Sequence, residues 1–114
     1  MKNVKSTIIS GGPASGKSWI AEAIANQYEK EAVKPFNSEW LLDKIHGDTI
    51  YFLNELNLKY GLIVIDECMA ADIIEIENTI KKDIRCAIVY LTQDDVKMKG
   101  NVKYHVINCN NNHE

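Results

Sequence analysis

The hydrophobic positions of this chain form short continuous runs, separated by stretches in which they recur at helical spacing. Uninterrupted apolar residues at Leu62–Ile65 and Cys86–Leu91 are typical of strands covered on both faces of a parallel sheet. The β-prone stretch Thr7–Ser10 predicts another strand, and alternation over Val102–Asn108 predicts a half-exposed edge strand. Ala32–Phe36 contains a proline, which cannot donate to a ladder, and indicates an edge strand or an extended connection.

Apolar residues three to four positions apart predict helices between these strands. Four helices are expected, covering residues 18–31, 38–46, 49–60 and 70–82. Asn37 or Ser38 can cap the second helix and Asp48 the third, while Gly47 and Gly61 follow their ends. Strands that alternate with helices predict an α/β domain with a largely parallel sheet.

Between the first strand and the first helix lies Gly-Gly-Pro-Ala-Ser-Gly-Lys-Ser, the spacing of a phosphate-binding loop. Gly11 and Gly16 let the backbone bend so that its N–H groups converge on phosphate oxygens at the helix N-terminus. Lys17 neutralises the charge of the β- and γ-phosphates, and the Ser18 hydroxyl is a ligand for Mg²⁺. The residues expected to contact nucleotide in this loop are Gly11, Gly12, Pro13, Ala14, Ser15, Gly16, Lys17 and Ser18.

Two strands are followed by polar residues at their carboxyl ends, where open α/β sheets bind ligands. Asp66 and Glu67 follow the first apolar run, so Asp66 can hold Mg²⁺ and Glu67 can act as general base on an attacking water. Thr92 and Gln93 follow the second run and are candidates for contact with the γ-phosphate. The alternative is that these two residues only form the turn after the strand.

Composition limits the remaining possibilities. The chain of 114 residues is 46% hydrophobic, enough for one domain, which we place at residues 1–109 before a polar tail at 110–114. A net charge of -3 gives no overall attraction to nucleic acid or anionic membrane. The basic cluster Lys97–Lys103 can touch nucleic acid, but a solvated turn is favoured. Three cysteines without metal-ligand spacing and the lack of a long apolar segment predict a soluble cytoplasmic protein with reduced thiols.

From about Val4 to Asn108, the loop and the two polar strand ends give the chain a resemblance to P-loop NTPases. It is similar in particular to the division with an additional catalytic glutamate, which includes AAA+ and RecA-like ATPases. The resemblance implies a three-layer α/β/α sandwich with a five-stranded, mainly parallel sheet of order 5-1-4-3-2. The roles it implies are phosphate binding and catalysis by Lys17, metal binding by Ser18 and Asp66, water activation by Glu67, and sensing of the γ-phosphate by Thr92 or Gln93.

The predicted function is therefore Mg²⁺-dependent ATP hydrolysis, slow in isolation and coupled to a partner or to self-assembly. AAA+ proteins normally add a helical lid with an arginine, whereas Arg85 is the only arginine here and precedes its strand. An activating charge is expected from Lys97, Lys99, another copy of the chain or a protein partner. The alternatives are a small-molecule kinase, which generally needs several arginines, and a nucleotide-binding switch without significant turnover.

Overall fold

The computed structural model describes residues 6–12, 15–27, 35–94 and 104–109. Strands and helices alternate along these ranges, as the pattern predicts. The elements are β1 (Ser6–Ser10), α1 (Lys17–Ala25), β2 (Phe36–Asn37), α2 (Ser38–His46), α3 (Thr49–Lys59), β3 (Leu62–Cys68), α4 (Ala70–Ile80), the 3-10 turn η1 (Lys81–Asp83), β4 (Ala87–Thr92) and β5 (Tyr104–Asn108). The proposed polar tail, the basic cluster at 97–103 and most of the 32–36 run lie outside the described residues.

The sheet has the order β5-β1-β4-β3-β2, and all its described pairings are parallel. β1 is a central strand, because Ile8 pairs with Tyr90 of β4 on one side and with Val106 of β5 on the other. β4 separates β1 from β3, so the loop strand and the Asp-Glu strand are not direct neighbours. The predicted order is confirmed, and the arrangement is consistent with a P-loop NTPase-like fold.

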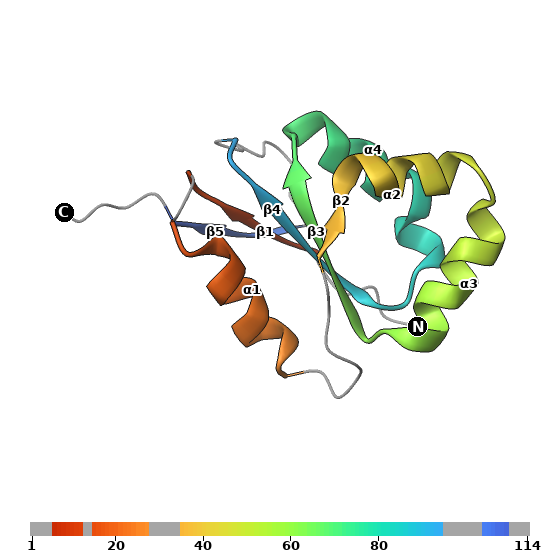
Figure 1. Cartoon of the computed structure of the whole chain (residues 1–114), viewed down its shortest axis with the longest axis horizontal. Coiled ribbons are helices and arrows are strands. Elements are labelled where there is room, and N and C mark those ends of the chain that lie inside the picture. Colours follow the sequence, from red (N-terminus) through yellow and green to blue (C-terminus); the bar gives the residue numbers. More distant parts are fainter. Residues whose placement is uncertain (1–5, 13–14, 28–34, 95–103, 110–114) are drawn as a thin grey trace.

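Helices cover both faces of the sheet, which confirms the three-layer prediction (Figure 1). Alternate strand residues point to opposite faces, so each strand supplies both hydrophobic clusters. Ile63 and Ile88 belong to the cluster beneath α2, α3 and α4, whereas Val64 and Val89 belong to the cluster beneath α1. The apolar runs at β3 and β4 are continuous because both of their faces are covered.

A partly buried polar network ties the sheet to α4 and η1. The Glu77 carboxylate accepts hydrogen bonds from the Ser6 hydroxyl and from the Tyr90 hydroxyl, both at 2.6 Å. The Lys81 ammonium donates to the Ser6 oxygen at 3.0 Å. Because Ser6 and Tyr90 are fully buried, these bonds satisfy polar groups that would otherwise cost free energy.

Several predicted boundaries were wrong. α1 ends at Ala25 and not near Glu31. Asn26, a poor helix former, follows its last residue, and Gln27 N–H donates to the Ile24 carbonyl in a tighter, 3-10-like turn. β3 continues past Ile65 to Cys68, and the last residues predicted for α4 form the 3-10 turn. No helix in the described residues is long and apolar enough to cross a membrane.

Candidate functional site

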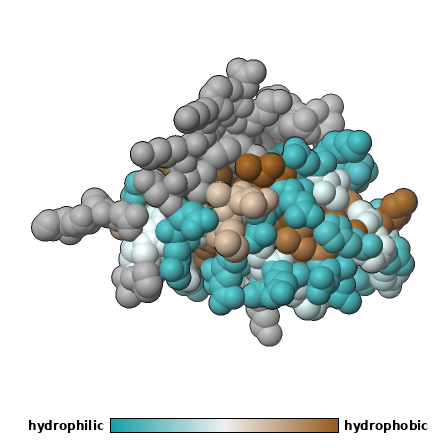
Figure 2. Space-filling view, turned by 90° about the horizontal axis from the view of Figure 1, so that it is seen from above, coloured by the Kyte–Doolittle hydropathy of each residue, from teal (hydrophilic) through white to brown (hydrophobic). Residues whose placement is uncertain are grey.

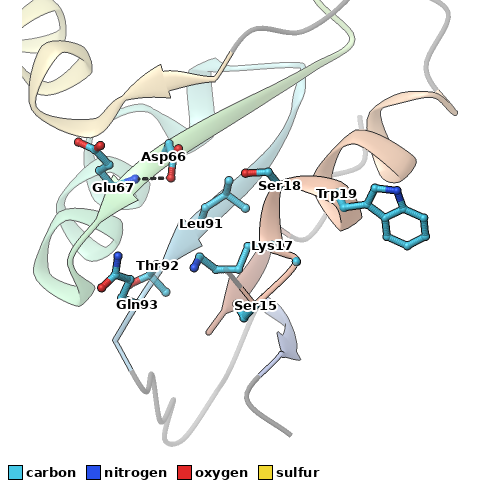
Figure 3. Close-up of a pocket in the computed structure, with 10 residues that line it drawn as sticks. Ser15, Lys17, Ser18, Trp19, Asp66, Glu67, Leu91, Thr92 and Gln93 are labelled. Atoms are coloured by element: carbon cyan, nitrogen blue, oxygen red, sulfur yellow. Dashed lines mark hydrogen bonds between the residues drawn. The ribbon is translucent and has the colours of Figure 1, made fainter. Parts of the chain in front are cut away.

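A cavity of about 490 Å³ lies at the carboxyl ends of β3 and β4 and beside the N-terminus of α1 (Figure 3). Parallel strands direct all their carboxyl ends to one edge, so residues that are distant in the sequence meet there. The lining residues are Ser15, Gly16, Lys17, Ser18, Trp19, Asp66, Glu67, Leu91, Thr92 and Gln93. All but Trp19 and Leu91 are residues that the sequence analysis selected. Seen from above, the described surface is mostly hydrophilic, with smaller hydrophobic areas (Figure 2).

The loop that bounds the cavity is anchored to the sheet. Gly11 N–H donates to the Thr92 carbonyl at 3.0 Å, so the loop starts as a continuation of the β1–β4 pairing. A Cβ at Gly11 would lie 2.4 Å from Ser15 Oγ and 2.9 Å from Cys109 Cβ, which only a glycine avoids. Gly16 has a φ of 92°, a left-handed conformation that favours glycine. Both glycines are therefore required by the loop geometry, while Pro13 and Ala14 lie outside the described residues.

Lys17 and Ser15 present polar groups within this loop. The Lys17 ammonium donates to the carbonyls of Gly11 and Gly12 at 2.8 and 2.7 Å. Ser15 Oγ is buried and has no hydrogen-bond partner among the described residues. A buried hydroxyl without a partner costs free energy, so it marks a position where a bound group can supply the missing bond.

A bulge delivers the two carboxylates to the cavity. Ile65 pairs with Tyr90 and Cys68 pairs with Thr92, so β3 carries one residue more than β4 between these pairs. Bulges redirect side chains, and this one interrupts the alternation that would send Asp66 and Glu67 to opposite faces.

The backbone at the bulge is strained, and the two acidic residues are linked. Glu67 adopts a φ of 57°, which is costly for a residue with a side chain and recurs at functional sites. Asp66 Oδ1 accepts the Glu67 N–H at 2.7 Å (Figure 3), which stabilises this turn of the chain.

Glu67 is held by a residue that the sequence analysis considered only as a helix cap. Asn37 Nδ2 donates to Glu67 Oε1 at 2.8 Å, while Asn37 Oδ1 accepts the Trp40 N–H at 3.1 Å and caps α2. One amide thus connects the proposed general base to the start of a helix. Asn37 pairs with Asp66 across β2 and β3. Without the sheet order, nothing in the sequence indicates this pairing.

The two candidate sensor residues differ in what their side chains do. The buried Thr92 hydroxyl donates to the Cys68 carbonyl at 2.7 Å and accepts the Asp94 N–H at 3.0 Å. Thr92 lines the cavity, but its hydroxyl is engaged in supporting the β3 and β4 ends. The exposed Gln93 lies between two anchored neighbours, since Asp94 Oδ2 also accepts Ala70 N–H at 2.9 Å. Gln93 is therefore the better placed of the two for contact with a ligand.

The thiols nearest the sheet are poor nucleophiles. Burial raises the pKa of Cys68 to about 12 and that of Cys86 to about 11, so both remain protonated near neutral pH. All three cysteines are free. In the described part of the chain, no three His, Cys, Asp or Glu side chains gather into a metal-binding group. The polar side chains that line the cavity carry carboxylate, hydroxyl, amide and ammonium groups.

Comparison with solved structures gives a distant likeness in fold, and the other comparisons give no match. No family model matches the chain, and no curated protein matches it significantly. Among solved structures, the crystal structure of the DnaC helicase loader is similar at a TM-score of 0.45 and 18% sequence identity. The match covers 83% of this chain and 62% of that chain. This chain thus spans less than two thirds of the length of that relative.

Proposed function

We propose that this protein binds ATP together with Mg²⁺ and hydrolyses it slowly in isolation. The observation that carries the proposal is the convergence of Lys17 and Ser18 with Asp66 and Glu67 on one cavity. These groups come from separate elements and have the chemistry that phosphoryl transfer needs: a cation for phosphate, oxygen ligands for a metal and a carboxylate for water.

The loop fits a polyphosphate. Ser15 Oγ is buried without a partner among the described residues, and a phosphate oxygen would satisfy it. The close approach of Gly11 to Ser15 supports a loop that is tightly formed, and the first turn of α1 contributes its positive end. Lys17 already donates to two loop carbonyls, so its ammonium is held where phosphate charge would be neutralised.

The cavity also fits Mg²⁺. Ser18 and Asp66 offer a hydroxyl and a carboxylate, the hard oxygen ligands that this ion prefers, with water and phosphate completing its shell. When bound, the ion neutralises charge on the phosphate oxygens. Asp66 Oδ1 accepts the Glu67 N–H, which restrains the carboxylate that would serve as ligand.

Hydrolysis requires Glu67 to accept a proton from an attacking water. Its carboxylate now accepts from Asn37, which directs one oxygen toward β2 and α2. A slow basal rate follows, and release of Glu67 by movement of α2 would raise it.

An external positive charge would also raise the rate. Arg85 is exposed and precedes β4, so it lies at the amino edge, opposite the cavity. Lys97 and Lys99 lie outside the described residues. A second copy of the chain or a protein partner is a further source, and such a charge is worth about 10³-fold or more in rate.

Isothermal titration of ATP and Mg²⁺ tests binding, and phosphate release tests turnover. Lys17→Ala should abolish binding, while Lys82→Ala removes the same charge from an exposed site on η1 and should have no effect. Glu67→Gln should retain binding and lower phosphate release by about 10²–10⁴-fold, or to background. Absence of ATP binding by the wild type would overturn the proposal.

The hydrogen bond between Asn37 and Glu67 favours a second candidate function, a nucleotide-dependent switch without significant turnover. In that case ATP would bind in a Lys17-dependent manner, and neither Glu67→Gln nor Asn37→Ser would alter phosphate release. A small-molecule kinase is less favoured because the one arginine lies at the opposite edge.

A further inference from the structure

Trp19 is a large apolar side chain that the fold leaves uncovered. It is 74% exposed although it stands in the first turn of α1, directly after Ser18. The face of α1 that packs on the sheet is marked by Ala21, which is buried. Two helical positions correspond to about 200°, so Trp19 lies on nearly the opposite side of the helix. The indole therefore does not serve the hydrophobic core.

Trp19 nevertheless lines the same cavity as the loop. The other lining residues are glycine, leucine or polar, so Trp19 is the aromatic ring among those described. Trp40, by contrast, packs against Phe36 and Phe52 and lies under the Lys44 ammonium. Of the two tryptophans in the chain, Trp40 has partners within the fold, whereas Trp19 is exposed at the rim of the cavity.

The cavity has two chemically different ends. In Figure 3, Asp66, Glu67 and Gln93 lie on one side of Lys17 and Ser18, while Trp19 lies on the other. Under the proposed function, the γ-phosphate belongs beside Glu67 and Gln93. The other end of the nucleotide must then extend past Ser18, toward the indole.

We propose that Trp19 stacks on the base of the bound nucleotide and thereby contributes to affinity. The inference rests on the proposed function and adds a contact for the base, the part of the nucleotide that the loop does not bind. A flat base is the part of a nucleotide that an exposed indole can cover, and stacking on one ring face accepts any base. We therefore expect the larger purine rings to bind more tightly than pyrimidines, with little discrimination between adenine and guanine.

The decisive experiment compares ATP with inorganic tripolyphosphate, which lacks a base, by titration in the presence of Mg²⁺. Trp19→Ala should weaken ATP binding by about 5- to 150-fold, the range for loss of one stacked base, while tripolyphosphate changes by less than about twofold. Trp19→Phe keeps an aromatic face and should recover most of the ATP affinity. Equal effects on the two ligands, or no effect on either, would overturn the inference.

Fluorescence provides a second readout. Trp40→Phe leaves Trp19 as the single tryptophan and should preserve the aromatic contacts with Phe36 and Phe52. ATP should then quench the emission, and tripolyphosphate should not. An identical response to both ligands would contradict stacking.

Failure of the proposed function and failure of the base-stacking inference give different results. If wild type binds neither ATP nor tripolyphosphate, the proposed function fails and the inference fails with it. If both bind in a Lys17-dependent manner but Trp19→Ala does not separate them, the inference alone fails. If Trp19→Ala changes the oligomeric state and leaves the difference between the ligands intact, Trp19 is a contact between copies and the base-stacking role is overturned.

Discussion

The two faces of the sheet differ: one contributes most of the described core, and the other carries the helix that contributes residues to the cavity. Beneath α2, α3 and α4 lies the larger of the two described clusters, to which α4 alone contributes Ile73, Ile76 and Ile80. On the other face, α1 has a single fully buried residue, Ala21, yet this helix carries Lys17, Ser18 and Trp19. Under the proposed function the first turn of α1 contacts the ligand, so it cannot also be buried. The candidate site therefore uses the helix of the more weakly packed face, while the other face supplies most of the buried core.

Truncation of one isoleucine on each face should give the largest difference in stability. Ile76→Ala removes a fully buried side chain beneath α4 and should lower the free energy of unfolding by about 3–4 kcal/mol, because the cavity cannot fully collapse. Ile24→Ala on α1 removes a half-buried side chain and should cost only about 1 kcal/mol. Urea unfolding measures both losses. Equal losses would show that the two faces contribute alike.

Gly11→Ala tests whether ATP affinity depends on the close packing of the loop. The new Cβ would lie 2.4 Å from Ser15 Oγ and 2.9 Å from Cys109 Cβ, so the loop must shift. We expect a loss of about 1–2 kcal/mol in stability and at least about tenfold in ATP affinity. Gly47→Ala is the matched control, since its Cβ would meet carbonyl oxygens only at 3.5 and 3.6 Å. Normal ATP affinity in Gly11→Ala would contradict the requirement for this close approach.

Part of the fold and of the candidate site could be predicted from the sequence. The apolar runs at 62–65 and 86–91 predict β3 and β4 because buried parallel strands need no alternation. The glycine positions of the loop were predictable because backbone geometry restricts them to one residue type. The strand order followed from the family resemblance, since no local pattern states which strands pair.

What the sequence could not reveal depends on contacts between distant residues. The bulge at Asp66-Glu67 arises from the pairing of β3 with β4, and apolar periodicity carries no mark of it. The link from Asn37 to Glu67 requires β2 to lie beside β3. The exposure of Trp19 was equally hidden, because an aromatic residue in a helix is more often packed. Each of these features lies at the site, where local rules are most often broken.

Substitution of Asn37 should have a smaller effect on stability, and it affects both the cap of α2 and the side chain of Glu67. Asn37→Ala removes the α2 cap and the hydrogen bond to Glu67, and should lower stability by about 1 kcal/mol. Asn37→Ser keeps a capping oxygen without the amide donor, so it should retain most of the stability. Both variants should release phosphate faster than wild type in a coupled assay, because Glu67 is then free to act as base. Unchanged phosphate release in both variants would show that the contact between Asn37 and Glu67 does not affect hydrolysis.

A pH dependence of stability should arise from Cys68, which belongs to the cluster beneath α2, α3 and α4. The pKa of Cys68 is raised by burial from 9.0 to about 12, so its stabilising contribution is complete below pH 9 and is lost as pH rises toward 12. Stability should fall by about 1 kcal/mol between pH 9 and pH 10 from this thiol. Urea unfolding at both pH values measures the fall, and Cys68→Ala should reduce it. An identical pH dependence in Cys68→Ala would rule out the thiol as its cause.

The position of β1 in the sheet has a consequence for how the protein is made. Thr7 finds its partners in Val89 of β4 and His105 of β5, which emerge from the ribosome long after it. β2, β3 and the helices between them can assemble from nearby sequence, whereas closing the chain between β1 and β4 is an entropically costly late event. The loop that follows β1, although synthesised before β4 and β5, is therefore among the last parts of this domain to acquire its structure. Under the proposed function, a nascent chain cannot engage nucleotide until β4 and β5 have been translated.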